Sequence, residues 1–80
     1  MNIVIIEDET LAADRLEKML YELEPEGKVL AKLGSVKESV KWLSKHTTDL
    51  IFLDIQLSDG LRFSIFEHIT VSTPVIVTTA

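Results

Sequence analysis

The amino-acid sequence predicts an α/β fold in which helices pack on a parallel β-sheet, and three observations lead to this class. Four short apolar segments rich in β-branched residues have the length of strands. Stretches with the apolar spacing of amphipathic helices separate them. Turn signals at residues 25–27, 58–60 and 72–74 bound the helical stretches. Because strands that alternate with helices are typical of parallel sheets, the expected order is β-α-β-α-β-α-β.

The first half of the chain supplies two strands and one helix. Residues 2–6 form a continuous apolar run, which predicts a strand buried on both faces. Residues 28–33 form the second strand, and their two lysines suit the edge of a sheet. Between them an amphipathic helix is expected from about Thr10, with its apolar face formed by Ala12, Leu16, Met19, Leu20 and Leu23.

The second half supplies the remaining elements. Ser35 and Glu38 have the spacing of a capping box, which predicts a helix beginning at Val36. Residues 50–53 form a third apolar strand that leads into Asp54. A third helix should then carry Leu61, Ile65, Phe66 and Ile69, and a last strand should occupy residues 75–78.

Composition narrows the classes of function. A length of 80 residues allows one small domain. Its 13 acidic and 8 basic residues give a net charge of −5, which argues against binding nucleic acid or an anionic membrane by charge. No apolar run approaches the ~20 residues of a membrane span, and acidic residues near the start of the sequence lead us to expect no secretory signal. The absence of cysteine fits a cytoplasmic protein.

Carboxylates follow two of the predicted strands, at the carboxyl-terminal ends of the strands, which is where parallel α/β folds bind ligands. Glu7, Asp8 and Glu9 follow the first strand, and Asp54 ends the third. Clustered carboxylates repel one another unless they are protonated or share a cation, and Mg²⁺ is the cation that prefers such oxygen ligands. The alternative is that Glu7, Asp8 and Glu9 are acids of a helix start and that Asp54 merely begins a loop. Glu9 is assigned to the helix start under either interpretation.

Three segments, IVIIEDE, DLIFLDIQLSDG and PVIVTTA, resemble the receiver domain of two-component response regulators, particularly those joined to a LytTR-type DNA-binding domain. The resemblance implies that Asp54 accepts a phosphoryl group from a sensor histidine kinase. It implies that Glu7, Asp8 and Asp54 hold Mg²⁺ together with the backbone carbonyl of Gln56. It also implies that the hydroxyl of Thr79 bonds the phosphoryl group and signals its presence, in preference to the neighbouring hydroxyl of Thr78.

The resemblance further implies a flavodoxin-like sheet of strand order 2-1-3-4, without the fifth strand and last helices of a receiver. Residues 1–80 are thus expected to be a single truncated receiver domain, without the lysine that the fifth strand brings to the phosphoryl group. The exposed strand edge at residues 75–79 predicts a homodimer or a swapped oligomer. DNA would be bound only by a missing C-terminal domain.

Three functions remain open from the sequence. The first is a signalling phosphoacceptor, which is not an enzyme and which relays kinase activity to transcription through its parent protein. The second is a module that dimerises independently of phosphorylation. The third is a small Mg²⁺-dependent phosphohydrolase, against which the segment Asp54-Ile55-Gln56 has no second acid two residues after the first.

Overall fold

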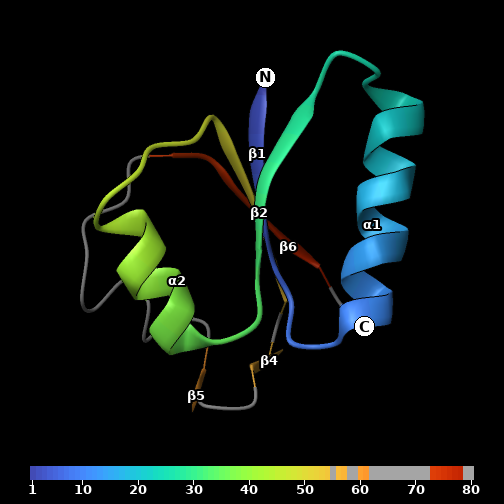
Figure 1. Cartoon of the computed structure of the whole chain (residues 1–80). Helices are drawn as coiled ribbons and strands as arrows, with labels where there is room; N and C mark the ends of the chain where they lie inside the picture. The colour runs from blue at the N-terminus through green and yellow to red at the C-terminus, as the bar shows by residue number, and fades with distance from the viewer. Residues whose placement is uncertain (55, 58–59, 62–72, 79–80) are drawn as a thin grey trace.

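A four-stranded parallel sheet organises the chain (Figure 1). The computed structural model describes all residues except 55, 58–59, 62–72 and 79–80. The strands are β1 (Asn2–Ile6), β2 (Lys28–Leu33), β3 (Leu50–Asp54) and β6 (Val75–Thr78), and their order in the sheet is β2-β1-β3-β6. This is the predicted order 2-1-3-4, and β2 is the predicted edge strand.

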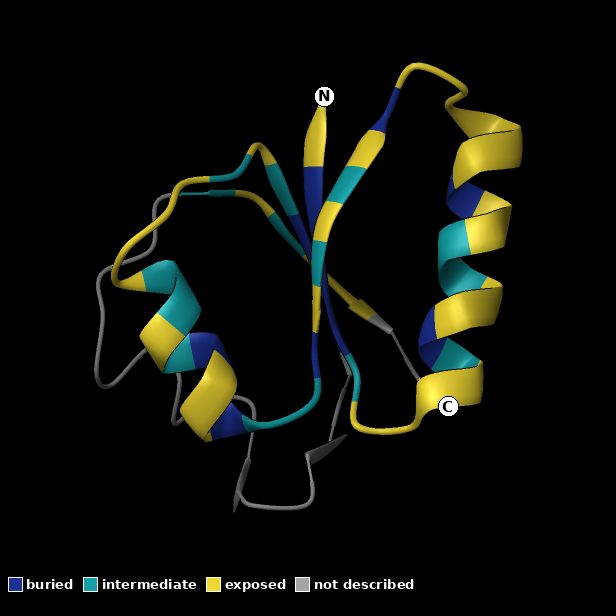
Figure 2. Ribbon diagram, in the orientation of Figure 1, coloured by how far each residue is buried: buried dark blue, intermediate teal, exposed yellow. Residues whose placement is uncertain are grey.

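The core lies on both faces of the two central strands. Val4, Ile6, Ile51 and Leu53 are fully buried on one face, where α2 (Val36–Leu43) packs. Ile3 and Ile5 are buried on the other face, which α1 (Thr10–Leu23) covers. Figure 2 shows that burial follows the central strands and the sheet-facing sides of the helices. The prediction that β1 is buried on both faces is therefore confirmed.

The apolar face predicted for α1 is partly wrong. Ala13 and Leu20 are buried against the sheet, and Leu16 packs beside them. By contrast, the side chains of Met19 and Leu23 are 53% and 75% exposed. The helix is rotated from the predicted orientation because its polar residues on the other flank also have partners on β2, as described below.

A β-bulge in β2 sets which of its side chains face each helix. Val29 pairs with Ile3, but Ala31 rather than Leu30 pairs with Val4, so β2 contains one extra residue at this point. Simple alternation would place residues 29, 31 and 33 on one face. The bulge instead leaves Val29 on the α1 face and moves Ala31 and Leu33 to the α2 face.

The predicted start of α2 is confirmed. Ser35 is its N-cap, and the Oγ atom of Ser35 accepts a hydrogen bond of 3.0 Å from the backbone N–H of Glu38. The carboxylate of Glu38 accepts a 3.4 Å hydrogen bond from the backbone N–H of Gly34. The cap therefore fixes the loop from β2 into α2.

After β3 the structure has two short strands, β4 (Gln56–Leu57) and β5 (Gly60–Leu61), which pair antiparallel. Leu61, predicted to belong to a third helix, instead pairs with Gln56 in this hairpin. The sequence has Ser58 and Asp59 between these two strands, and both residue types favour turns. Ile65, Phe66 and Ile69 lie outside the described residues.

Neither of the helices that the structure describes is long and apolar enough to traverse a lipid bilayer.

We expect Ser35→Ala to lower the free energy of unfolding by about 1 kcal/mol, because the first turn of α2 loses its side-chain acceptor. Urea unfolding would measure the loss. Ser44→Ala is the matched control at the other end of the helix, where the Ser44 hydroxyl donates to the carbonyl of Lys41 at an exposed position. A loss no larger for Ser35→Ala than for Ser44→Ala would contradict this role of the cap.

Candidate functional site

Two carboxylates, those of Glu7 and Asp8, directly follow the carboxyl-terminal end of β1. We call the side of the sheet where the strands end in this direction the carboxyl edge. The backbone N–H of Glu7 donates to the carbonyl of Leu33 at 2.9 Å, which extends the pairing of β1 with β2 by one residue. The Oε1 atom of Glu7 accepts a 3.1 Å hydrogen bond from the backbone N–H of Glu9. Asp8 is exposed between them. Glu9 is the N-cap residue of α1, as its predicted assignment to the helix start requires.

The register of the sheet places the backbone of Asp54 at the same carboxyl edge, beside that of Glu7. Ile6 of β1 lies beside Leu53 of β3, so the next residues along these parallel strands are Glu7 and Asp54. Asp54 is in turn the register partner of Thr78 on β6. The sheet thus brings together two chain segments that the sequence separates by more than forty residues.

The other predicted site residues are placed less completely. The backbone of Gln56 lies in β4, two residues beyond Asp54. The side chain of Asp54 and the whole of Thr79 lie outside what the structure describes. The roles predicted for Asp54, Gln56 and Thr79 therefore stay predictions.

A cavity of about 310 Å³ opens beside these carboxylates, between the loop that follows β1 and the loop that follows β2. It is lined by Glu7, Asp8, Thr10, Ala13, Asp14, Lys32, Gly34 and Glu38. Four of these residues carry carboxylates and one carries an ammonium group. The cavity therefore suits a hydrated cation better than an apolar ligand.

The donor set is compatible with Mg²⁺. This ion is usually bound through one or two protein carboxylates, and it keeps several waters. Glu7 and Asp8 provide two carboxylates at the cavity. Within the described residues no group of three or more His, Cys, Asp or Glu side chains has the geometry of a metal site, and the Asp54 side chain is not among those considered.

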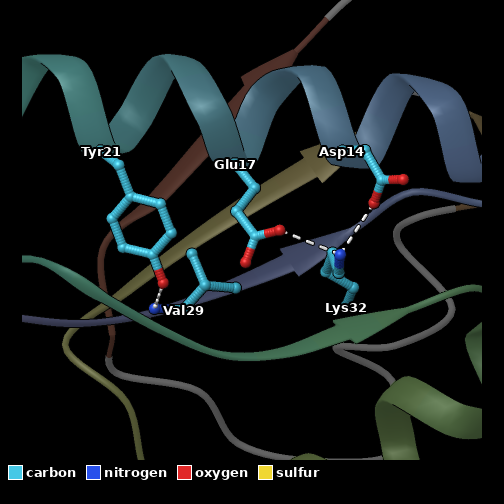
Figure 3. A network of polar contacts seen from close by, with 5 residues as sticks. All are labelled: Asp14, Glu17, Tyr21, Val29 and Lys32. Atoms are coloured by element: carbon cyan, nitrogen blue, oxygen red, sulfur yellow. Dashed lines mark hydrogen bonds and ion pairs between the residues drawn. The ribbon is translucent and has the colours of Figure 1, made fainter.

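Lys32 is a residue of the cavity that the sequence interpretation missed. Its Nζ atom lies 2.7 Å from Asp14 Oδ1 and 2.9 Å from Glu17 Oε1, and both acids belong to α1 (Figure 3). These hydrogen bonds, the one to Asp14 first, raise the pKa of Lys32 from 10.5 to about 12. The sequence contained one signal, because Asp14 and Glu17 are three residues apart and share a helix face. The sequence did not reveal the bulge in β2, which places the side chain of Lys32 on the α1 face beside these two acids.

Figure 3 also shows a second link between α1 and β2, made by Tyr21. The hydroxyl oxygen of Tyr21 accepts a 3.2 Å hydrogen bond from the backbone N–H of Val29. Asp14, Glu17 and Tyr21 therefore connect one flank of α1 to β2. These contacts explain why this flank, and not the predicted one with Met19 and Leu23, is turned toward the strand.

An aromatic pair lies on α2 and just after it. Trp42 packs against the core on the α2 face. Its ring stacks on His46 with 4.5 Å between the ring centroids, and His46 Nδ1 lies 3.0 Å from the carbonyl oxygen of Trp42. His46 is exposed, as expected of a surface residue.

Comparison with known proteins agrees with this architecture. Residues 3–80 match the family described as "Response regulator receiver domain". The chain is 37% identical over 65 residues to the sensory transduction protein LytT of Bacillus anthracis, and 33% identical over 70 residues to LytT of Enterococcus faecalis. These matches cover 81% and 88% of this chain but only 26% and 28% of the two relatives. The chain thus spans about a quarter of the length of the curated relatives that it matches.

Solved structures give the same result. The receiver domain of Erythrobacter litoralis PhyR superposes with a TM-score of 0.81 at 30% identity, covering 99% of this chain and 62% of that one. A PhyR variant from Bartonella quintana gives a TM-score of 0.83 at 30% identity, covering 99% and 33%. The MaeR response regulator bound to beryllium trifluoride gives 0.86 at 23% identity, covering 100% and 67%, a likeness that concerns the fold alone.

The sheet order and these matches lead to one assignment. Receiver domains are signalling modules rather than classical enzymes, and LytT-type regulators are among the relatives of this chain. The chain belongs to the response regulator receiver family of two-component systems and has its flavodoxin-like fold.

Proposed function

We propose that this receiver takes a phosphoryl group from a sensor histidine kinase onto the carboxylate of Asp54. The observation that carries the proposal is the sheet register, which aligns the backbone of Asp54 with that of Glu7 at the end of β1. Glu7 and Asp8 line one cavity at that edge. Family membership supports the same role, because Asp54 ends the apolar strand at which receivers carry their phosphoacceptor.

The transfer itself asks little of the protein beyond position and charge. An oxygen of Asp54 attacks the phosphorus of a phosphohistidine, and a P–O bond forms as the P–N bond breaks. The imidazole nitrogen leaves with the bonding electron pair and takes up a proton. Bound Mg²⁺ would neutralise the charge that gathers on the phosphoryl oxygens.

The other residues of the proposed site would bind the metal ion and contact the phosphoryl group. Glu7 and Asp8 would hold Mg²⁺ together with Asp54 and the backbone carbonyl of Gln56. The hydroxyl of Thr79 would donate to a phosphoryl oxygen and draw its loop inward, which gives the domain two states. The parent protein would pass this change to transcription through a separate DNA-binding domain, since a net charge of −5 does not favour contact of this chain with DNA.

We expect Asp54→Asn to abolish phosphorylation, because the amide is not a nucleophile toward phosphorus. The measurement is labelling by acetyl phosphate with Mg²⁺, followed by intact mass. Asp49→Asn is the matched control, because Asp49 lies just before the opposite end of β3 and accepts a hydrogen bond from the backbone N–H of Asn2, which an amide oxygen can also accept. Equal labelling of wild type and Asp54→Asn would end the assignment of Asp54.

We expect Asp8→Asn to weaken Mg²⁺ binding by roughly tenfold or more, because one anionic ligand becomes neutral. Isothermal titration calorimetry with MgCl₂ would measure the dissociation constant. Glu22→Gln removes a charge from the exposed part of α1 far along the helix, and it should leave the constant unchanged. An Asp8→Asn protein that binds Mg²⁺ as tightly as wild type would contradict the proposed ligand set.

We propose dimerisation through β6 as a second function, because one observation favours it. β6 is the outermost strand of the described sheet on its side, and its Ile76 and Val77 side chains are 46% and 47% exposed. An exposed apolar strand edge favours pairing with another strand. The family match supplies no support for the phosphohydrolase alternative.

For the 80-residue chain, we expect Ile76→Lys to shift sedimentation toward the monomer, since a charge on an edge strand discourages pairing. Leu23→Lys is the control, because Leu23 is a more exposed apolar residue on α1. A wild-type chain that sediments as a stable monomer at micromolar concentration would refute dimerisation.

A further inference from the structure

Lys32 is held by α1 at the cavity that contains the proposed Mg²⁺ ligands. Its ammonium group forms ion pairs of 2.7 Å with Asp14 and 2.9 Å with Glu17 (Figure 3). Lys32 and Asp14 line the same cavity as Glu7 and Asp8. A permanently charged cation therefore lies at a site that we propose for a second cation.

The position of Lys32 results from the bulge in β2. Because the bulge adds one residue after Val29, Lys32 pairs with Ile5 on the α1 face of the sheet. Without the bulge, alternation would turn Lys32 toward the α2 face. Bulges near functional sites commonly re-aim a side chain in this way.

Two groups of acids line the cavity together with Lys32, namely Asp14 of α1 and the pair Glu7 and Asp8 that follows β1. If its ammonium group paired with Asp8, it would occupy an oxygen that Mg²⁺ needs and would repel the ion. Within the part of the chain that the structure describes, the ion pairs of Lys32 are with acids of α1. Asp14 and Glu17 also outweigh its charge, so the three side chains together carry a net charge of −1.

We propose that Asp14 and Glu17 are positioning residues that hold the Lys32 ammonium group on α1 and so keep it from pairing with Asp8, a proposed Mg²⁺ ligand. The inference rests on the proposed function. It concerns three side chains that act through the metal ligands, and none of the three touches the phosphoryl group in this scheme. Its consequence is that the affinity for Mg²⁺ depends on a contact between α1 and β2.

The test is a double-mutant cycle read by titration of the 80-residue chain with MgCl₂ in a calorimeter. Asp14→Asn should weaken Mg²⁺ binding by roughly two- to fivefold, the size expected for a charge interaction at an exposed site. Lys32→Met should tighten binding by a similar factor. In the Lys32→Met background, Asp14→Asn should have a clearly smaller effect, because no ammonium group remains to be released.

The coupling energy between positions 14 and 32 distinguishes two effects of Asp14: its ion pair with Lys32, and the long-range field of its carboxylate. If Asp14 acted only through its long-range field, Asp14→Asn would change the affinity equally with Lys32 or Met at position 32, and that result would overturn the inference. Lys28→Met and Glu22→Gln are matched controls on the same strand and the same helix, remote from the cavity, and should change the affinity little. Thermal unfolding of each variant establishes that it is folded at the titration temperature.

The outcomes also separate this inference from the proposed function. A wild-type chain without measurable affinity for Mg²⁺ would contradict the proposed metal site itself. A wild-type chain that binds Mg²⁺, loses affinity in Asp8→Asn and shows no coupling between positions 14 and 32 would contradict only the role of Asp14 and Glu17.

Discussion

The parallel pairing of β1 with β3 is the contact on which the site depends. It is fixed at its N-terminal end by a small polar cluster. The backbone N–H of Asn2 donates to Asp49 Oδ2 at 2.7 Å, while the carbonyl of Asn2 accepts hydrogen bonds of 2.9 Å from the Asp49 backbone and the Thr48 hydroxyl. Because β1 is buried on both faces, a slip of one residue would exchange its apolar side chains between the two cores, and the packing against α1 and α2 would have to change. The register that protects the core therefore also sets Asp54 level with Glu7.

Charge is distributed unevenly around that edge. Among the residues that the structure describes, four that line the cavity beside β1 carry carboxylates, and Lys32 carries an ammonium group. The Lys32 ammonium group is charged at neutral pH even at its ordinary pKa of 10.5, and the hydrogen bonds to Asp14 and Glu17 raise that pKa to about 12. The local surplus of negative charge favours a divalent cation.

The fold is shared far more widely than any one regulator's activity. Receiver structures superpose on this chain with TM-scores above 0.8 at identities of 30% and below. Apolar strands and a helix on each face of the sheet suffice for that likeness, because many apolar sequences can fill the same core. What distinguishes one regulator from another lies in the residues of its site and of its surfaces.

The sequence alone determined the elements of the described sheet and much of the site. Apolar runs gave all four strands of the sheet, and the Ser35–Glu38 spacing gave the start of α2, because these signals are local. The positions of Glu7, Asp8 and Asp54 at strand ends followed from the same runs. The role of Thr79 and the side-chain geometry of Asp54 lie outside what the structure describes.

Only the tertiary structure decided which residues meet across elements. The bulge in β2 shows no local signal, because KVLAKL is compatible with regular alternation, and the pairing with β1 selects the bulged register. The rotation of α1 depends on the same pairing, since Lys32 and Val29 offer partners to Asp14, Glu17 and Tyr21. Helical spacing defines an apolar stripe only to within a fraction of a turn. Contacts with the neighbouring strand therefore determined that Ala13 and Leu20, and not Met19 and Leu23, became the core of α1.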